Sequence, residues 1–359
     1  MWTGAPKEVA PSTLHRAMTW LLGTISVIST LLAIAASQAG HVATGKLVLF
    51  AAWTATFALL IRMVPVLWAQ AARFMVTDRH VIWTCGRLKR TIQRDGISFA
   101  RITWNRTNPR IGDMDLVRAV PTGALNRRLT LNFKGVTAPH RVWTIVRGAQ
   151  SVAGSVGGGD VPLEARLDQG EVARWSARPV RSWRAWLPMS TRRSLTAALG
   201  GLCWMAAVRT ILMGIPLTGR LVAGGISPTS LAFVSLVGAV ALTVVLLAVI
   251  GVWFLHFGLS RKPWLDRTTR YLVTNHRIIL QRGRQELHVV RGAVVDLAVR
   301  DGLYGGRDVY LVVDGPQSRA LSAQGAFGPA ERVSGFRPLL QGLSAADVDA
   351  LRDELNGRR

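Results

Sequence analysis

Few residues of this sequence have the spacing that catalysis or metal binding needs. The seven histidines are scattered along 359 residues, and no two of them lie at the spacing of metal ligands on one helix. Cys85 and Cys203 do not form a Cys-x-x-Cys pair, and neither a His-Glu-x-x-His nor a Gly-x-Ser-x-Gly motif occurs. The sequence therefore predicts no catalytic residue, no metal site and no cofactor, and we do not expect an enzyme.

One pair of carboxylates has a spacing that could serve acid–base chemistry. Asp113 and Asp115 would point to the same face if their segment were a strand. Paired carboxylates can exchange protons with a substrate. A solvated turn before Leu116 is the favoured interpretation.

Basic residues are the stronger signal. The net charge is +24, which would suggest nucleic acid or an anionic surface in a soluble protein, but is expected of cytoplasmic segments in a membrane protein. We favour the membrane interpretation, and nucleic acid is not an expected partner because no aromatic–basic motif accompanies the charge. A candidate surface for anionic ligands, with a solvated basic surface as the favoured alternative, consists of Arg79, Arg87, Lys89, Arg90, Arg277, Arg282 and Arg284.

Arg209 is the one charge near the middle of an apolar block. Charged residues inside a membrane are costly and are candidates for function. An equally good interpretation is that the span is shifted, so that Arg209 lies nearer an interface or faces other helices.

These residues are positioned by four apolar blocks, each long enough to cross a bilayer as a helix of about 20 residues. A signal peptide is the alternative for the first block, because Ser37-Gln38-Ala39 resembles a cleavage site. The second block follows almost at once, which favours an uncleaved helix. The sequence predicts four transmembrane helices in two hairpins, over residues 19–37, 47–68, 195–217 and 230–257.

Short β-like runs follow each pair of apolar blocks. The first set begins near Val76 and is expected to include a strand at Arg141–Val146. The Gly-rich stretch from Ala149 to Asp160 is interpreted as a linker, since it lacks the Lys-Ser/Thr of a phosphate loop. At the end, Ser344 is a predicted N-cap for an amphipathic helix over Ala345–Leu355.

The chain contains an internal repeat. Trp2-Thr3-Gly4-Ala5-Pro6 matches Trp175-Ser176-Ala177-Arg178-Pro179 in its Trp, hydroxyl and Pro. The hairpin from Arg73 to Trp83 matches the one from Arg270 to Leu280, and Gly86-Arg87 matches Gly283-Arg284. We predict an N-terminal segment and membrane hairpin over 1–72, a β domain over 73–148, a linker over 149–170, a second membrane hairpin over 171–262 and a second β domain over 263–359.

Charge predicts the orientation. The loops at 40–46 and 218–229 carry only Lys46 and Arg220, whereas the flanks at 73–90, 181–193 and 261–270 are dense in Arg and Lys. The positive-inside rule places both termini and both β domains in the cytoplasm. The cysteine usage agrees with a reducing compartment.

The second half carries a family resemblance. Tyr271-Leu272-Val273-Thr274, the turn at Gly283 and the segment from Glu171 to Pro179 resemble bacterial membrane proteins with pleckstrin-homology-like domains. The first half is less similar, with Phe74 in place of the tyrosine. The resemblance implies a curved seven-stranded sheet capped by a helix, which the helix expected over Ala345–Leu355 fits, in a multi-pass protein of the bacterial cytoplasmic membrane.

The resemblance also implies a function, although it reports fold more directly. We expect a non-enzymatic protein that binds or scaffolds, with anionic lipid headgroups or membrane proteins as partners in addition to the lipid bilayer itself. The alternative is a four-span transporter or channel-like protein with Arg209 lining a path. The oligomeric state stays open.

Overall fold

The computed structural model describes residues 1–9, 13–38, 44–97, 99–119, 128–149, 158–225, 227, 230–313 and 339–356. The chain divides into two compact units. A helical unit comprises Pro11–Val64 and Ala185–Pro263, and a β unit comprises Met1–Ala10, Pro65–Arg184 and Trp264–Arg359. Segments of both repeats therefore contribute to each unit.

The helical unit contains four helices that are long and apolar enough to cross a membrane. Their surfaces carry exposed apolar side chains such as Leu31 (60% exposed) and Val249 (61%), which lipid accommodates and water does not. This composition is consistent with a multi-pass membrane protein. The helices are α1 (Thr13–Gln38), α2 (Thr44–Gln70), α4 (Thr191–Ala223) and α5 (Leu231–Leu255).

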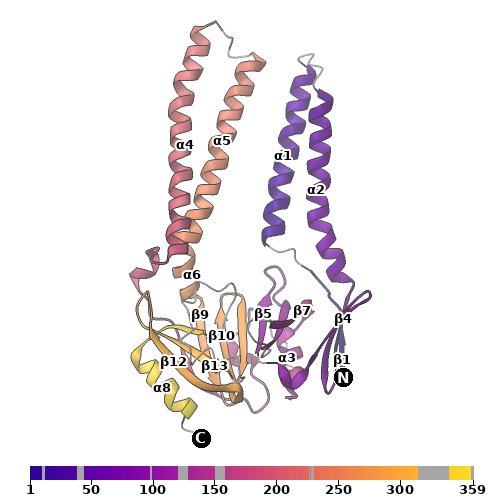
Figure 1. Ribbon diagram of the computed structural model, residues 1–359, viewed down its shortest axis with the longest axis vertical. Helices are drawn as coiled ribbons and strands as arrows, with labels where there is room; N and C mark the ends of the chain where they lie inside the picture. Colours follow the sequence, from indigo (N-terminus) through magenta and orange to yellow (C-terminus); the bar gives the residue numbers. More distant parts are fainter. Residues whose placement is uncertain are drawn as a thin grey trace. The chain divides into compact units, whose positions relative to one another are not determined.

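Small residues let the helices approach closely within each pair (Figure 1). Ser26 Oγ on α1 donates to the carbonyl of Ala51 on α2 at 2.9 Å. Gly200 on α4 faces the Leu255 side chain, and Gly251 on α5 faces the Trp204 side chain, so a Cβ at either glycine would meet that side chain within 3 Å. Close packing through small residues is the usual way for membrane helices to associate.

A buried arginine secures the end of the α4–α5 pair. After α5 the chain forms one π-helical turn, His256–Ser260, and then α6, Arg261–Arg267. Arg193 Nε donates to the carbonyl of Gly258 at 2.9 Å, and its Nη2 donates to the carbonyl of Ala185 at 3.0 Å. A π-helical turn alters the regular hydrogen bonding of a helix, and Arg193 supplies two donors there, since its Nη2 also donates to the carbonyl of Leu259 at 3.1 Å.

The β unit repeats the same order of elements. From the first repeat come β1 (Trp2–Gly4), β2 (Ala72–Val76), β3 (His80–Cys85), β4 (Leu88–Gln93), β5 (Phe99–Trp104), β6 (Ile111–Ala119), β7 (Arg128–Thr137) and α3 (Pro139–Arg147). From the second come β8 (Ala173–Ala177), β9 (Thr269–Thr274), β10 (Arg277–Arg282), β11 (Gln285–Val290), β12 (Val294–Asp301), β13 (Arg307–Val313), β14 (Leu339–Leu343) and α8 (Ala345–Asn356). Both Trp-containing motifs form edge strands, β1 against β2 and β8 against β9.

One sheet crosses from the first repeat to the second. The strand orders are β1-β2-β3-β4, β7-β6-β5-β11-β10-β9-β8 and β12-β13-β14, all antiparallel. The junction is the β5–β11 pair, in which Phe99 lies opposite Val289 and Thr103 opposite Gln285. The sequence did not predict this junction, because nothing in a strand's own pattern names its partner.

The strand expected at Arg141–Val146 is wrong, since these residues lie in α3. Pro139 stands in its first turn and Gly148 closes it with φ 73°, the usual proline and glycine positions of a helix. Its β-branched residues suggested a strand, but Val142, Trp143 and Val146 face the core at helical spacing. The first repeat thus has a C-terminal helix like the second, where α8 is capped by Ser344 as predicted.

Only part of the predicted linker can be compared with the structure. Residues 150–157 lie outside the described residues. The described remainder is packed, because Leu163 and Arg166 in a 3-10 turn (Leu163–Arg166) are buried. Two other 3-10 turns, Arg94–Gly96 and Arg291–Ala293, follow β4 and β11 at equivalent places in the two repeats. Another 3-10 turn, Trp183–Trp186, precedes α4.

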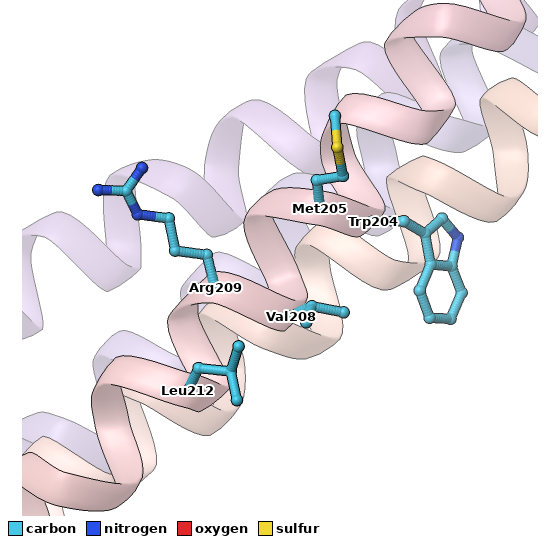
Figure 2. A pocket seen from close by; sticks show the side chains of 5 residues that line it. All are labelled: Trp204, Met205, Val208, Arg209 and Leu212. Atoms are coloured by element: carbon cyan, nitrogen blue, oxygen red, sulfur yellow. The ribbon is translucent and has the colours of Figure 1, made fainter.

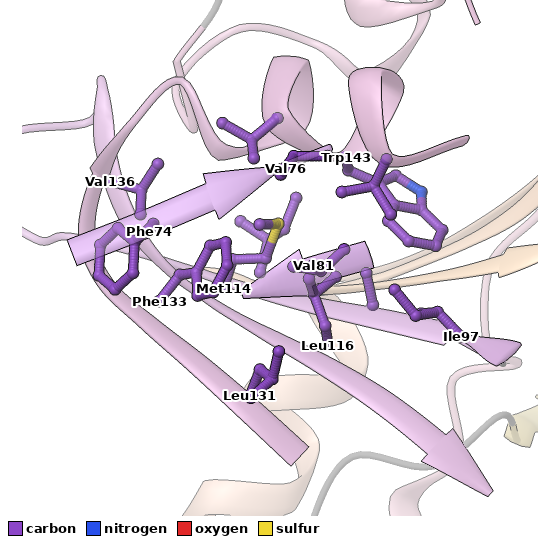
Figure 3. Packing of buried hydrophobic residues seen from close by; sticks show 14 of the residues in the cluster. Phe74, Val76, Val81, Ile97, Met114, Leu116, Leu131, Phe133, Val136 and Trp143 are labelled. Carbon is purple, nitrogen blue, oxygen red and sulfur yellow. The ribbon is translucent and has the colours of Figure 1, made fainter. Parts of the chain in front are cut away.

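Each repeat builds its own apolar core. In the first, Phe74 stacks on Phe133 with ring centroids 4.4 Å apart, Met114 lies beside Phe133, and Trp143 belongs to the same buried cluster (Figure 3). In the second, Tyr271, Leu287 and Leu340 are buried against α8, whose Val348 and Leu351 face inward.

Candidate functional site

The turn between β3 and β4 lies beside the end of α2. Gly86 has φ 57°, which suits a two-residue hairpin turn. Cys85 Sγ is 3.5 Å from the carbonyl oxygen of Trp68, in the last turn of α2. Beyond the turn, exposed basic side chains flank Leu88, which is itself 55% exposed. These basic residues are Arg87, Lys89 and Arg90.

The turn between β10 and β11 has the equivalent position in the second repeat. Gly283 has φ 60°, and its N–H donates to the carbonyl of Thr268 at 3.2 Å, just after α6. Arg284 is exposed, and Arg282 is half-buried. Both basic hairpin turns thus contact the chain at the end of a candidate membrane span, Gly45–Gln70 in the first repeat and Val237–Arg267, which continues from α5 through α6, in the second.

The structure divides the seven predicted basic residues into two groups. Five of them, Arg87, Lys89, Arg90, Arg282 and Arg284, lie at or next to these two turns, which we call the basic tips. Arg79 lies in the turn at the opposite end of β3, about 20 Å away for a six-residue strand. Arg79 is exposed but does not belong to the basic tips.

Arg277 requires a correction, since it does not lie on a ligand-accessible surface. It is 1% exposed, and its Nε and Nη2 donate to the Glu171 carboxylate at 2.8 Å each. Glu171 also accepts from the Thr274 hydroxyl at 2.6 Å. The charge of Arg277 therefore serves an internal ion pair.

Sequence reasoning missed the buried polar network to which Arg277 belongs. Arg166 forms a fork with Glu286, and His288 Nε2 lies 3.3 Å from the same carboxylate. Asp168 accepts hydrogen bonds from Thr144 and Arg147 on α3. The network connects α3, the segment that follows it and the β10–β11 hairpin. Once the structure is known, one pattern in the sequence can be connected with the network. Acidic and basic residues alternate along a strand, as Glu286 and His288 do.

The environment sets the charges in this network. Burial alone would raise the pKa of Glu286, but the hydrogen bond with His288 and the positive charge of Arg166 lower it to about 2. Burial lowers the pKa of His288 to about 4, and the charge of Arg277 acts in the same direction. Near neutral pH the network thus contains an ionised Glu286 beside a neutral His288.

His140 on α3 lies at the margin of the network. It is 5% exposed, and its ring centroid is 5.8 Å from that of Trp104. Neither ring nitrogen has a hydrogen-bond partner among the described residues. Burial, assisted by the charge of Arg166, lowers the pKa of His140 to about 4, so the ring is neutral near pH 7.

The expected turn at Asp113 and Asp115 is wrong, since both residues lie in β6. Asp113 Oδ1 accepts from the Gly135 N–H at 2.8 Å, beside an irregularity in the β6–β7 pairing. Asp115 lies opposite Arg101 on β5. Burial raises the pKa of both carboxyls. Their observed partners give each a structural role.

Arg209 is exposed on α4 and has no hydrogen bond or ion pair with any other described residue. It borders a shallow hollow of about 400 Å³ together with Trp204, Met205, Val208 and Leu212. All five residues belong to α4, and Figure 2 shows Arg209 and Trp204 projecting from different sides of that helix. A hollow lined by one helix is not a path between helices.

Within the described ranges, no group of three or more His, Cys, Asp or Glu side chains could hold a metal ion. Comparison of the chain with protein-family models, with curated proteins and with solved structures found no match.

Proposed function

We propose that this protein is a non-enzymatic, multi-pass protein of the bacterial cytoplasmic membrane whose β unit binds anionic lipid headgroups and acts as a scaffold at the cytoplasmic face. The observation that carries this proposal is the contact of each basic tip with the chain segment that leaves an apolar helix. These contacts are Cys85 with Trp68 and Gly283 with Thr268.

Those contacts support a position of the basic tips at headgroup level. A 27-residue helix such as α2 is about 40 Å long, which matches a bilayer with its headgroup regions. Trp68, near its end, has the side chain that prefers the membrane interface. A basic residue near an anionic surface contributes about 1 kcal/mol to binding. The several basic residues of the two tips would therefore attract the β unit to anionic lipid headgroups.

The connectivity of the chain supports a common side for both basic tips. Two candidate spans separate β1 from β2, and two more separate β8 from β9. An even number of crossings returns the chain to the same side each time. The Arg-rich flanks favour the cytoplasm as that side.

The fold supports a binding domain of the pleckstrin-homology-like kind. Each repeat has a four-stranded antiparallel set followed by three strands and a helix, ending with α3 or α8. Proteins are a second class of partner for the same surface.

Hydrogen exchange of the full-length protein in nanodiscs tests the proposal. We expect slower exchange of peptides covering Thr84–Thr91 and Gln281–Leu287 in discs with phosphatidylglycerol than in neutral discs, and less difference at high salt. Substituting Arg87, Lys89, Arg282 and Arg284 by Gln should abolish the difference. The control replaces the exposed Arg79 and Arg106 by Gln and should change nothing. Equal exchange in neutral and anionic discs would refute lipid binding.

A further inference from the structure

The two repeats use equivalent strands unequally. An offset of 197 residues relates Gly86 to Gly283, and it therefore relates β4 to β11 and β5 to β12. β5 of the first repeat pairs with β11 of the second. The reciprocal pair, β12 with β4, is not formed. Among the described strands, β4 pairs only with β3, and β12 pairs only with β13.

Burial follows this difference. In β11, Leu287 and Val289 are 0% exposed, and only Gln285 at its start is exposed. In β4, only Ile92 is buried, although the strand has the same place in its repeat. β12 is also less buried than β5, with Asp296, Arg300 and Asp301 exposed. An open edge strand presents unpaired N–H and C=O groups that favour pairing with another chain.

We infer that β12 of one copy of this protein pairs antiparallel with β4 of a second copy, as β5 pairs with β11 within one copy. The occupant is a second copy because the chain already contains this interface once, between its own repeats. Among the described strands, each copy carries one unpaired half of the same interface at β4 and the other half at β12.

The offset fixes the register of the intermolecular pair. Thr103 lies opposite Gln285, and Arg101 opposite Leu287. The equivalent partners are Arg300 opposite Leu88 and Ala298 opposite Arg90. The hydrogen bond from Trp104 N to the carbonyl of Arg284, 2.9 Å long, becomes one from Asp301 N to the carbonyl of Arg87.

One directly opposed pair in this register is of opposite charge, Asp301 beside Arg87, and such pairs attract. Arg90 has Asp296 on one diagonal and Arg300 on the other, so it adds no clear preference. Asp296 stands where β5 carries Phe99, so this end of the pair lacks the apolar contact of the β5–β11 junction. The interface joins two different surfaces, and such an interface repeats into a closed ring or a filament.

A proline substitution separates strand pairing from lipid binding. In the two-residue hairpin, Leu88 pairs with Cys85, so the N–H of Lys89 points to the open edge. Lys89→Pro removes that N–H and should leave the β3–β4 hairpin intact, since proline is tolerated on edge strands. Lys89→Ala removes the same charge but keeps the N–H. Light scattering of the full-length protein in detergent measures the outcome. The wild-type protein and the Lys89→Ala variant should be oligomeric, whereas the Lys89→Pro variant should be mainly monomeric.

Disulfide trapping tests the register. In a background with Cys85→Ala and Cys203→Ala, one tagged copy carries Leu88→Cys and a differently tagged copy carries Arg300→Cys. A non-hydrogen-bonded antiparallel pair has Cα atoms about 4.5 Å apart, within the range of a disulfide. Membranes that contain both tagged copies should yield a disulfide-linked heterodimer on mild oxidation. When Asp301→Cys replaces Arg300→Cys, no heterodimer should form, because adjacent residues face opposite sides of a sheet.

The inference does not depend on lipid binding, and the two can fail separately. Monomeric wild-type protein, or equal cross-linking of Arg300→Cys and Asp301→Cys, would overturn the strand pairing. Oligomers that Lys89→Pro leaves intact would also overturn it, by showing that a different surface holds the copies together.

Discussion

Arg166 and Glu286 form a buried two-point ion pair, with Nη1 3.1 Å from Oε2 and Nη2 2.8 Å from Oε1. The side chains are 3% and 0% exposed. Arg166 belongs to the segment between the repeats, and Glu286 belongs to β11, which also accepts β5 from the first repeat. The pair thus secures the strand at which the two repeats meet.

Breaking this pair on one side should destabilise the β unit strongly. Arg166→Met leaves the Glu286 charge buried without its main partner, a loss that costs about 3–5 kcal/mol in buried pairs. The matched control is Arg270→Met, because the Arg270–Glu164 pair is 32% and 39% exposed and exposed pairs contribute about 0–1 kcal/mol. The free energy of unfolding of both variants is measured by urea titration of purified protein, with the susceptibility of the β unit to proteolysis as the readout. Equal effects of the two variants would contradict a special role of the buried pair.

Acid should weaken the β unit before the Glu286 carboxylate is titrated, since the pKa of Glu286 is about 2. The pKa values of His140 and His288 are lowered to about 4, whereas an unfolded histidine has a pKa of about 6.5. Between these values the unfolded chain binds more protons than the folded one, so stability is full above pH 6.5 and falls as the pH decreases toward 4. Each histidine contributes on the order of 3 kcal/mol to this loss.

His140→Phe isolates one of these contributions. The substitution keeps an aromatic ring against Trp104 and removes two ring nitrogens that lack partners among the described residues. We expect a flatter decline of unfolding free energy between about pH 6.5 and 4. His276→Gln is the control, because His276 is exposed. An unchanged pH profile of His140→Phe would show that His140 does not titrate differently in the folded protein.

The sequence predicted local structure better than assembly. The apolar blocks, the β-hairpins and the Ser344 cap could be recognised because each leaves a periodic or turn pattern within a short window. α3 was mistaken for a strand because a short run of β-branched residues suits both states. The β5–β11 junction could not be predicted, since strand pairing depends on edges brought together by the whole fold.

The candidate site shows the same division. Gly86 and Gly283 allowed the two turns to be predicted, and the neighbouring basic residues could be identified from the sequence. Arg277 looked the same in sequence as Arg284, yet one is buried against Glu171 and the other is exposed. What separates them is the segment containing Glu171, about a hundred residues earlier, whose contact with β10 has no local signature.

The segment 264–359 should not fold stably by itself. It lacks β8, which pairs with β9, and β5, which pairs with β11. It would also leave Arg277 and Glu286 without Glu171 and Arg166, two uncompensated charges in sites that are buried in the whole protein. We expect poor solubility and little protection from hydrogen exchange. A well-dispersed NMR spectrum of this fragment would show that the repeat folds without its partner.

Arg209→Leu should make insertion of α4 into the membrane more favourable. Arg209 is exposed on its helix and has no described partner, and an arginine at the centre of a membrane helix costs about 2.5–3.5 kcal/mol relative to solution on insertion scales. Replacing it by leucine removes that cost without opening a cavity. Leu212→Arg, on the same helix, is the converse control and should weaken insertion by a similar amount. Translocon insertion of a reporter that carries Thr191–Ala223 measures both changes. If Arg209→Leu lowered the yield or stability of the full-length protein instead, Arg209 would have a partner that compensates its charge.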